Sequence, residues 1–212
     1  MLRTGKDWSK NAKIDEGVII GYPPDRNIEN LNLIMGENPR LRSGTVIYQG
    51  SKIGKNFQTG HNVIIREENQ IGENVVVASN SVVDYGCTIG NNVKIHCNVY
   101  VAQYTIIEDD VFIAPGVVIA NDPHPGCEFS KPCMKGPTIK KGAQIGVNVT
   151  LLPYIVIGKK VLVGSGSVVT KDVPDESVAV GNPAKIVGSI YDIECFTGLT
   201  DKPYKKIGSN NL

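Results

Sequence analysis

The chain has 212 residues, a length that suits one domain, and 41% of them are hydrophobic, which is enough for a core. Its 22 basic and 21 acidic residues leave a formal net charge of +1, which excludes a strong electrostatic attraction to nucleic acid or to an anionic membrane. No apolar run approaches the ~20 residues that span a bilayer. Five cysteines without a CxxC pair, and a start without an apolar leader, predict free thiols in a reducing, cytoplasmic compartment.

Residues 1–40 are predicted to form the start of a repeat, followed by a loop. Ile14 and Ile20 stand six residues apart in the sequence around IDEGVIIG, and this spacing continues later in the chain. A polar excursion at residues 22–40 follows them and contains the turn-forming stretches YPPDRN and ENPR. We expect this excursion to leave the regular structure.

A period of six residues extends over residues 41–187. Nineteen of the 20 positions spaced by six from Leu41, with a restart at Ile139, are Ile, Leu or Val. Three residues after these positions stands Asn, Gly or Asp in 16 of 20 cases, and these residue types adopt a left-handed backbone at low cost. Each unit is therefore predicted to be a short strand and a corner, with two side chains pointing inward. Three units would make a coil of 18 residues, with parallel strands paired between coils and Gly54, Gly72 and Gly90 stacked on one edge.

This repeat resembles that of the hexapeptide-repeat transferases, whose fold is a left-handed parallel β-helix. The resemblance implies an all-β chain with the coil over residues 41–187 and a C-terminal tail at 188–212. A loop at 120–138, with the sequence ANDPHPGCEFSKPCMKGPT from residue 120, interrupts the coil. Long loops in compact domains are usually functional or disordered, so this loop is a candidate for the site.

The three histidines, His61, His96 and His124, do not form a predicted metal site. A zinc-dependent carbonic anhydrase family shares the hexapeptide fold, but the HxxxxH pair of that family is missing here. His61 and His96 fall on adjacent positions of one corner, two coils apart. They are either solvated surface residues or part of an acceptor-binding site at a subunit interface, and both readings stay open.

His124 lies in the loop, in the sequence NDPHP that begins at Asn121. An imidazole accepts a proton near neutral pH, and Asp122 is close enough in sequence to orient it. The segment resembles the loop of hexapeptide acetyltransferases that act on sugars, in which a histidine is the general base. The alternatives are a purely structural loop residue and an acceptor amine that attacks without a base.

The last repeats, followed by VTKDVP and GNPAK, resemble the coenzyme A end of the same family. By this resemblance, small residues leave a groove beside the coil, two lysines face phosphates and a turn packs against adenine. The residues implied are Ala143, Gly146, Gly164 and Ser165 for the groove, Lys171 and Lys185 for the phosphates, and Asn182 and Pro183 for the turn. The alternative is that the glycines only satisfy the corners of the coil.

The stretch IGNNVKIHCNVYV resembles the branch of sugar N-acetyltransferases that act on nucleotide-linked deoxysugars, and this implies that Asn98 lines the acceptor pocket with His96. His61 is a further candidate for binding the acceptor. The expected protein is a homotrimeric, acetyl-CoA-dependent acetyltransferase of an amino sugar, without a metal. Two alternatives remain: transfer to a sugar hydroxyl, and a non-catalytic β-helix scaffold.

Overall fold

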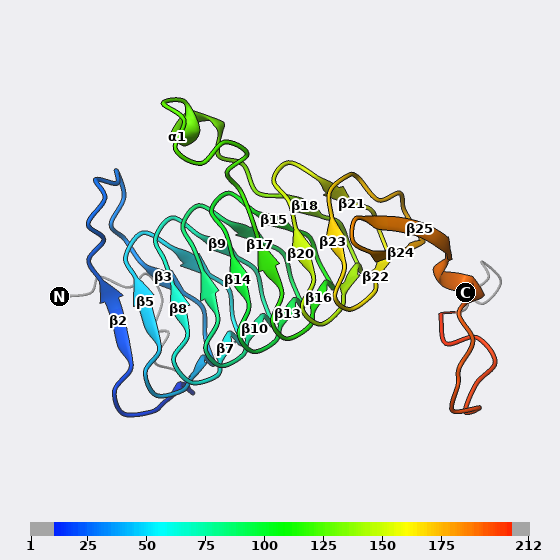
Figure 1. The fold of residues 1–212 in the computed structure, drawn as a ribbon. Helices are drawn as coiled ribbons and strands as arrows, with labels where there is room; N and C mark the ends of the chain where they lie inside the picture. Colours follow the sequence, from blue (N-terminus) through cyan, green and yellow to red (C-terminus); the bar gives the residue numbers. More distant parts are fainter. Residues whose placement is uncertain (1–10, 205–212) are drawn as a thin grey trace, which may run out of the picture.

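The computed structural model describes residues 11–204, which wind into a left-handed parallel β-helix (Figure 1). Each turn contributes one short strand to each of three sheets, so strands three apart along the chain pair with each other. The predicted fold class is therefore confirmed. Among the described residues no helix is long and apolar enough to span a bilayer.

The three sheets are named A, B and C here. Sheet A contains β1 (Lys13–Ile14), β4 (Arg40–Leu41), β7 (Gln58–Thr59), β10 (Val76–Val77), β13 (Lys94–Ile95), β16 (Phe112–Ile113), β19 (Gln144–Ile145), β22 (Leu162–Val163), β24 (Ser177–Gly181) and β25 (Ala184–Ser189). Sheet B contains β2 (Ile19–Tyr22), β5 (Val46–Tyr48), β8 (Ile64–Ile65), β11 (Val82–Val83), β14 (Tyr100–Val101), β17 (Val118–Ile119), β20 (Thr150–Leu151) and β23 (Val168–Val169). Sheet C contains β3 (Ile34–Met35), β6 (Lys52–Ile53), β9 (Gln70–Ile71), β12 (Thr88–Ile89), β15 (Ile106–Ile107), β18 (Thr138–Ile139) and β21 (Val156–Ile157).

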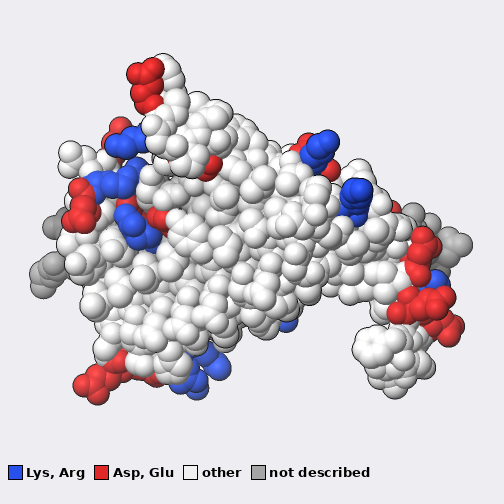
Figure 2. Space-filling model, in the orientation of Figure 1, with Lys and Arg blue, Asp and Glu red and all other residues white. Residues whose placement is uncertain are grey.

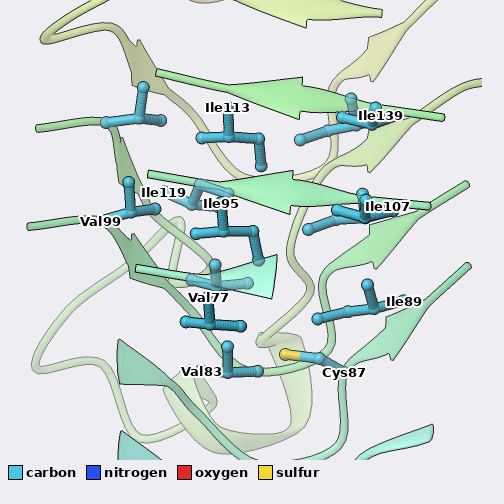
Figure 3. Close-up of a cluster of buried hydrophobic side chains, with 14 of the residues drawn as sticks. Val77, Val83, Cys87, Ile89, Ile95, Val99, Ile107, Ile113, Ile119 and Ile139 are labelled. Atoms are coloured by element: carbon cyan, nitrogen blue, oxygen red, sulfur yellow. The ribbon is translucent and has the colours of Figure 1, made fainter. Parts of the chain in front are cut away.

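The core is a stack of aliphatic side chains inside the coil. The second residue of nearly every two-residue strand is buried, and so is the residue four positions later, as with Val77, Val93 and Val99. Figure 3 shows Ile89, Ile107 and Ile139 above one another on the inner side of sheet C. The prediction of two inward side chains in each unit is confirmed.

The three corners are named AB, BC and CA, after the sheets that each one links in chain order. Nearly every corner contains a residue with a positive φ angle, which is the left-handed backbone predicted from the Asn, Gly and Asp positions. On corner CA the side-chain amides form a ladder, in which each amide donates to the side-chain oxygen one coil further on. The ladder runs through Asn11, Asn38, Asn56, Asn74 and Asn92 to Asp110, with distances of 2.8–3.1 Å.

Corner CA also contains the predicted glycine column, Gly54, Gly72 and Gly90, which Gly36 extends. A Cβ atom on Gly72 would lie 2.7 Å from the carbonyl carbon and oxygen of Gly90, which is closer than real Cβ contacts. The coils therefore approach each other too closely here for any side chain.

Gly72→Ala is expected to destabilise the coil, because the backbone of the next turn must move to admit the methyl group. Such overpacking costs about 1–3 kcal/mol, which lowers Tm by roughly 2–4 °C per kcal/mol in a chain of this size. Thermal unfolding measures the effect. The matched control is Gly188→Ala, whose Cβ meets nothing within 4 Å, and equal shifts of Tm in the two variants would contradict the prediction.

Two loops leave the coil, and both do so at corner BC (Figure 1). The first is shorter than predicted and covers residues 23–33, because β3 already pairs with β6 and returns the chain to the coil at Ile34. Met35 takes the inward position of that unit and is 2% exposed. The second loop occupies residues 120–137 and contains the short helix α1 (Ser130–Cys133).

The C-terminal end of the coil is covered by an antiparallel hairpin. Strands β24 and β25 pair with each other after β24 has paired with β22 in sheet A. A turn of 3-10 helix, η1 (Ile190–Asp192), follows and buries Ile190. The remaining tail extends away from the coil in Figure 1 and leaves Phe196 99% exposed.

The cysteines in the described part of the chain are free thiols in different environments. A hydrogen bond with the Thr197 hydroxyl, 3.0 Å away, lowers the pKa of Cys195 to about 7, whereas burial raises the pKa of Cys87 to about 12. Because the thiolate is the reactive form, we expect alkylation of Cys195 to level off above about pH 7, while Cys87 stays unmodified in the folded protein. Mass spectrometry after pulses of iodoacetamide at several pH values measures both, and Thr197→Val should move the Cys195 profile to higher pH. A Cys195 rate that still rises steeply above about pH 8 would contradict the assignment.

Candidate active site

Corner AB brings together six of the residues implied by the family resemblance. They lie in the connections from β7 to β8, β13 to β14, β19 to β20 and β22 to β23, and they are His61, His96, Asn98, Gly146, Gly164 and Ser165. The repeat places them in neighbouring columns along a single edge of the coil. Residues over a hundred positions apart in sequence thus share one surface.

The two histidines of corner AB have different contacts. His96 is half-buried, and its ring lies 4.9 Å from the ring of Phe112, centroid to centroid. His61 is exposed, and its Nδ1 lies 2.8 Å from the hydroxyl of Ser43 in the preceding coil. Asn98 has a φ angle of 57° and is exposed two residues after His96. The predicted sharing of one outward corner is confirmed, whereas a role in binding an acceptor stays a prediction.

The small residues of this corner are required by the coil itself. A Cβ atom on Gly146 would lie 2.6 Å from the backbone of Ser165, and one on Gly164 would lie 2.6 Å from Cγ1 of Val180. The Ser165 hydroxyl accepts a hydrogen bond from the backbone N–H of Val147 at 3.1 Å. These residues therefore satisfy the stacking of the coil, whereas a groove for coenzyme A beside them stays a prediction.

Ala143 is a correction to the predicted groove. Its side chain is fully buried in the core, because it stands four residues after Ile139, at the second inward position of its unit. A side chain that points into the coil cannot line a groove outside it.

The remaining residues assigned to coenzyme A lie at the C-terminal end of the coil, on two different elements. Asn182 and Pro183 form the turn between β24 and β25, with a cis peptide bond, and Lys185 follows in β25. Lys171 is exposed on corner BC, after β23, and so lies on a different edge from Gly146. One copy of the chain does not gather all of these residues on one corner.

His124 is exposed at the start of the second loop, on corner BC. The sequence suggested that Asp122 orients the imidazole of His124, but the structure shows no hydrogen bond between Asp122 and that ring. The Asp122 carboxylate instead accepts the backbone N–H of His124 at 2.9 Å and the hydroxyl of Ser130. The Ser130 hydroxyl, followed by the His124 N–H, lowers the pKa of Asp122 below its ordinary value. Asp122 therefore fixes the backbone beside His124 rather than the ring.

A polar network at the base of this loop was not predicted from the sequence. Asp84 is 6% exposed and accepts hydrogen bonds from the Tyr100 hydroxyl at 2.8 Å and from Nε2 of Gln103 at 2.6 Å. Oε1 of Gln103 in turn accepts from Nδ2 of Asn121 at 2.8 Å. The signal in the sequence is that Gln103 and Asn121 are amides 18 positions apart, which places them in one column of corner BC.

The structure has no cluster of three or more His, Cys, Asp or Glu side chains suited to a metal ion within residues 11–204. Acetyl transfer without a metal stays a prediction.

Residues 86–121 match the family model described as bacterial transferase hexapeptide (six repeats). The chain carries the transferase hexapeptide repeat. Over 61 residues, the chain is 48% identical to dTDP-3-amino-3,6-dideoxy-alpha-D-galactopyranose 3-N-acetyltransferase of Aneurinibacillus thermoaerophilus, covering 29% of this chain and 31% of that protein. Over 101 residues, it is 37% identical to galactoside O-acetyltransferase of Escherichia coli, covering 43% of this chain and 48% of that protein.

A hexapeptide-repeat acetyltransferase of Vibrio cholerae, solved with acetyl coenzyme A, aligns with a TM-score of 0.49 and 24% identity, over 57% of this chain and 70% of that one. The aligned segments span less than half the length of the two curated relatives. The similarity to those relatives thus covers only part of this chain and less than half of theirs.

Proposed function

We propose that the chain is one subunit of a homotrimeric acetyltransferase, which transfers the acetyl group of acetyl-CoA to the amine of a nucleotide-linked amino sugar. The observation that carries this proposal is the position of sheet B, whose outward-facing strand residues are uncharged, between two polar corners. Corner AB, with His96 and Asn98, borders sheet B on one side, and the His124 loop leaves corner BC on the other.

The outer face of sheet B is suited to packing against a second copy. The outward residue of each of its strands is uncharged, and nearly all are apolar: Ile19, Val46, Ile64, Val82, Tyr100, Val118, Thr150 and Val168. Sheets A and C present lysines and an arginine at the equivalent positions, among them Arg40, Lys94 and Lys52. Figure 2 shows the surface over β14, β17 and β20 without charged side chains. A contiguous apolar face of this kind marks an interaction site in a protein exposed to water.

Closure of three copies around an axis would bury this face without producing an open filament. In such a ring, the BC corner of one copy approaches the AB corner of the next. His124 would then face the acceptor residues of the neighbouring subunit, and Lys171 would approach the coenzyme A groove from the other side. The division of the site residues between two corners supports an active site shared by two subunits.

The chemistry at such a site is attack of the amine nitrogen on the thioester carbonyl. A C–N bond forms and the C–S bond breaks, while the proton of the amine passes to the imidazole of His124 and then to the leaving thiolate of coenzyme A. Backbone N–H groups of corner AB other than those of Gly146 and Gly164 would hold the oxyanion, since these two donate to the carbonyls of Val163 and Ala179.

An amine acceptor is supported by the 48% identity to an amino-sugar N-acetyltransferase over 61 residues. A sugar hydroxyl is the second candidate, and the presence of His124 favours it, because a hydroxyl is a poor nucleophile and needs a base. The similarity to galactoside O-acetyltransferase supports the same alternative.

Acetyl transfer to a panel of amino sugars, nucleotide-linked amino sugars and unmodified sugars would test the proposal, with release of free thiol as the readout and mass spectrometry to locate the acetyl group. Coenzyme A should raise Tm, because a ligand at 100 times its Kd stabilises the folded state by about 2.7 kcal/mol. A scaffold would show neither effect. Acetylation of hydroxyl groups only would establish the second candidate.

A further inference from the structure

We propose that Gln103 is a positioning residue for the loop that carries His124, and that it acts through Asn121. This inference rests on the proposed role of His124 as the base. The geometry behind it is a continuous chain of polar contacts from the coil to the first residues of the loop.

The loop is fastened to the coil at its first polar residue. Asn121 is 8% exposed, and its backbone carbonyl accepts the N–H of Lys135, so that it joins the two ends of the loop at a distance of 2.8 Å. Its side-chain amide donates to Oε1 of Gln103, which lies one coil earlier on the same corner. Asn121 is thus fixed through both its backbone and its side chain.

Gln103 has only one orientation that satisfies its neighbours. Its Nε2 donates to the buried carboxylate of Asp84, so its Oε1 must face Asn121. Asp84 is fixed in turn by the Tyr100 hydroxyl, by the backbone N–H of Tyr85 at 2.9 Å, and by Nη1 of Arg66 at 3.7 Å. A carboxylate can only accept here, and this property sets the direction of every hydrogen bond in the chain.

Asn121 transmits this order to His124 over a short distance. The next residue, Asp122, accepts the backbone N–H of His124 and the hydroxyl of Ser130 in α1. Only two residues, Asp122 and Pro123, therefore separate the fixed end of the loop from His124. A displacement of Asn121 would therefore also displace His124, because so few residues between them can absorb the movement.

The decisive variant is Gln103→Ala, with Gln49→Ala as its control. Gln49 occupies the same corner position three coils earlier, and its side chain makes no hydrogen bond within residues 11–204. We expect Gln103→Ala to lower kcat by about 10–100-fold, because small displacements of a catalytic group have effects of this size, and to leave the KM for acetyl-CoA unchanged. Amide hydrogen exchange should become faster in residues 122–134 and stay unchanged in the coil at 89–119. Gln49→Ala should change neither.

A double-mutant cycle separates positioning from a general structural effect. If Gln103 acts through His124, Gln103→Ala should cause no further loss of kcat in a His124→Ala background. Losses that multiply, or equal behaviour of Gln103→Ala and Gln49→Ala, would overturn the proposal.

A reversal of polarity supplies a rescue. Gln103→Glu alone places two carboxylates together and should be at least as harmful as Gln103→Ala. Combined with Asp84→Asn, it restores the contact between positions 84 and 103, since the amide introduced at position 84 would donate to the new carboxylate, which still accepts from Asn121, and the Tyr100 hydroxyl would accept from the same amide. Recovery of kcat in the pair is the expected result, and failure of the pair to recover while its Tm is normal counts against the inference.

The exchange measurement keeps this inference distinct from the proposed function. Absence of acetyl transfer by the natural sequence, or full activity of His124→Ala, would remove the role of His124. Loop exchange in Gln103→Ala would still decide the positioning: faster exchange in residues 122–134 supports it, and unchanged exchange overturns it.

Discussion

Replacement of His124 by alanine is expected to lower kcat by about 10²–10⁴-fold and to leave the KM for acetyl-CoA nearly unchanged, as for the loss of a general base. His124 is exposed on a loop outside the coil, so Tm should scarcely change. Steady-state kinetics and thermal unfolding measure both quantities. Glu128→Ala, an exposed change in the same loop, is the control and should keep the natural rate.

The pH dependence of the His124→Ala variant separates the two classes of acceptor. High pH should partly restore its rate with an amine acceptor, because the amine becomes nucleophilic once its own proton has left. A hydroxyl acceptor should show no such recovery below its much higher pKa. An unchanged kcat of the variant at neutral pH would exclude His124 as the base and make His96 the next candidate.

A charge placed on the outer face of sheet B is expected to dissociate the proposed trimer and abolish activity. Val118→Lys would place an ammonium group in an apolar interface without a partner, at a cost of several kcal/mol for each contact. Sedimentation should therefore show monomers at micromolar concentration, and acetyl transfer should fall by at least about 100-fold if the site needs two subunits.

The matched control is Ile106→Lys on sheet C. Val118 is 47% exposed and Ile106 is 39% exposed in the single chain, and both are first residues of two-residue strands. The control should stay trimeric and active. Dissociation by Ile106→Lys and not by Val118→Lys would transfer the interface to sheet C, and a trimer that remained active with both changes would contradict the shared site.

The coil was predictable because its aliphatic residues recur at every sixth position. The same period placed His61 and His96 on one corner without any knowledge of the structure. The pattern of Ile, Leu and Val misses Met35, which fills an inward position six residues before Leu41. The predicted first loop is therefore too long. Ala143 shows an incomplete use of the rule, because its offset of four residues already predicted an inward side chain.

The structure of the loop at 120–137 could not be predicted from the six-residue period. Nothing in the repeat specifies that Asp122 turns to the backbone of His124, because that geometry depends on α1 and on Ser130. The connection between Gln103 and Asn121 was accessible in principle, since the two residues are 18 positions apart and therefore occupy one column.

The amide ladder on corner CA limits how this protein can change in length. Each of its hydrogen bonds between Asn38 and Asp110 joins residues separated by 18 positions, so an insertion or deletion within this stretch preserves the ladder only if it adds or removes whole turns. Beyond Asp110 the constraint ends, because a carboxylate accepts the last amide and is held by Lys141 at 3.4 Å. The loop at 120–137 lies after this end point, so extra residues in that loop do not disturb the ladder. An insertion between Asn38 and Asp110 should therefore keep the ladder only in multiples of 18 residues, whereas one in the loop at 120–137 should leave it intact.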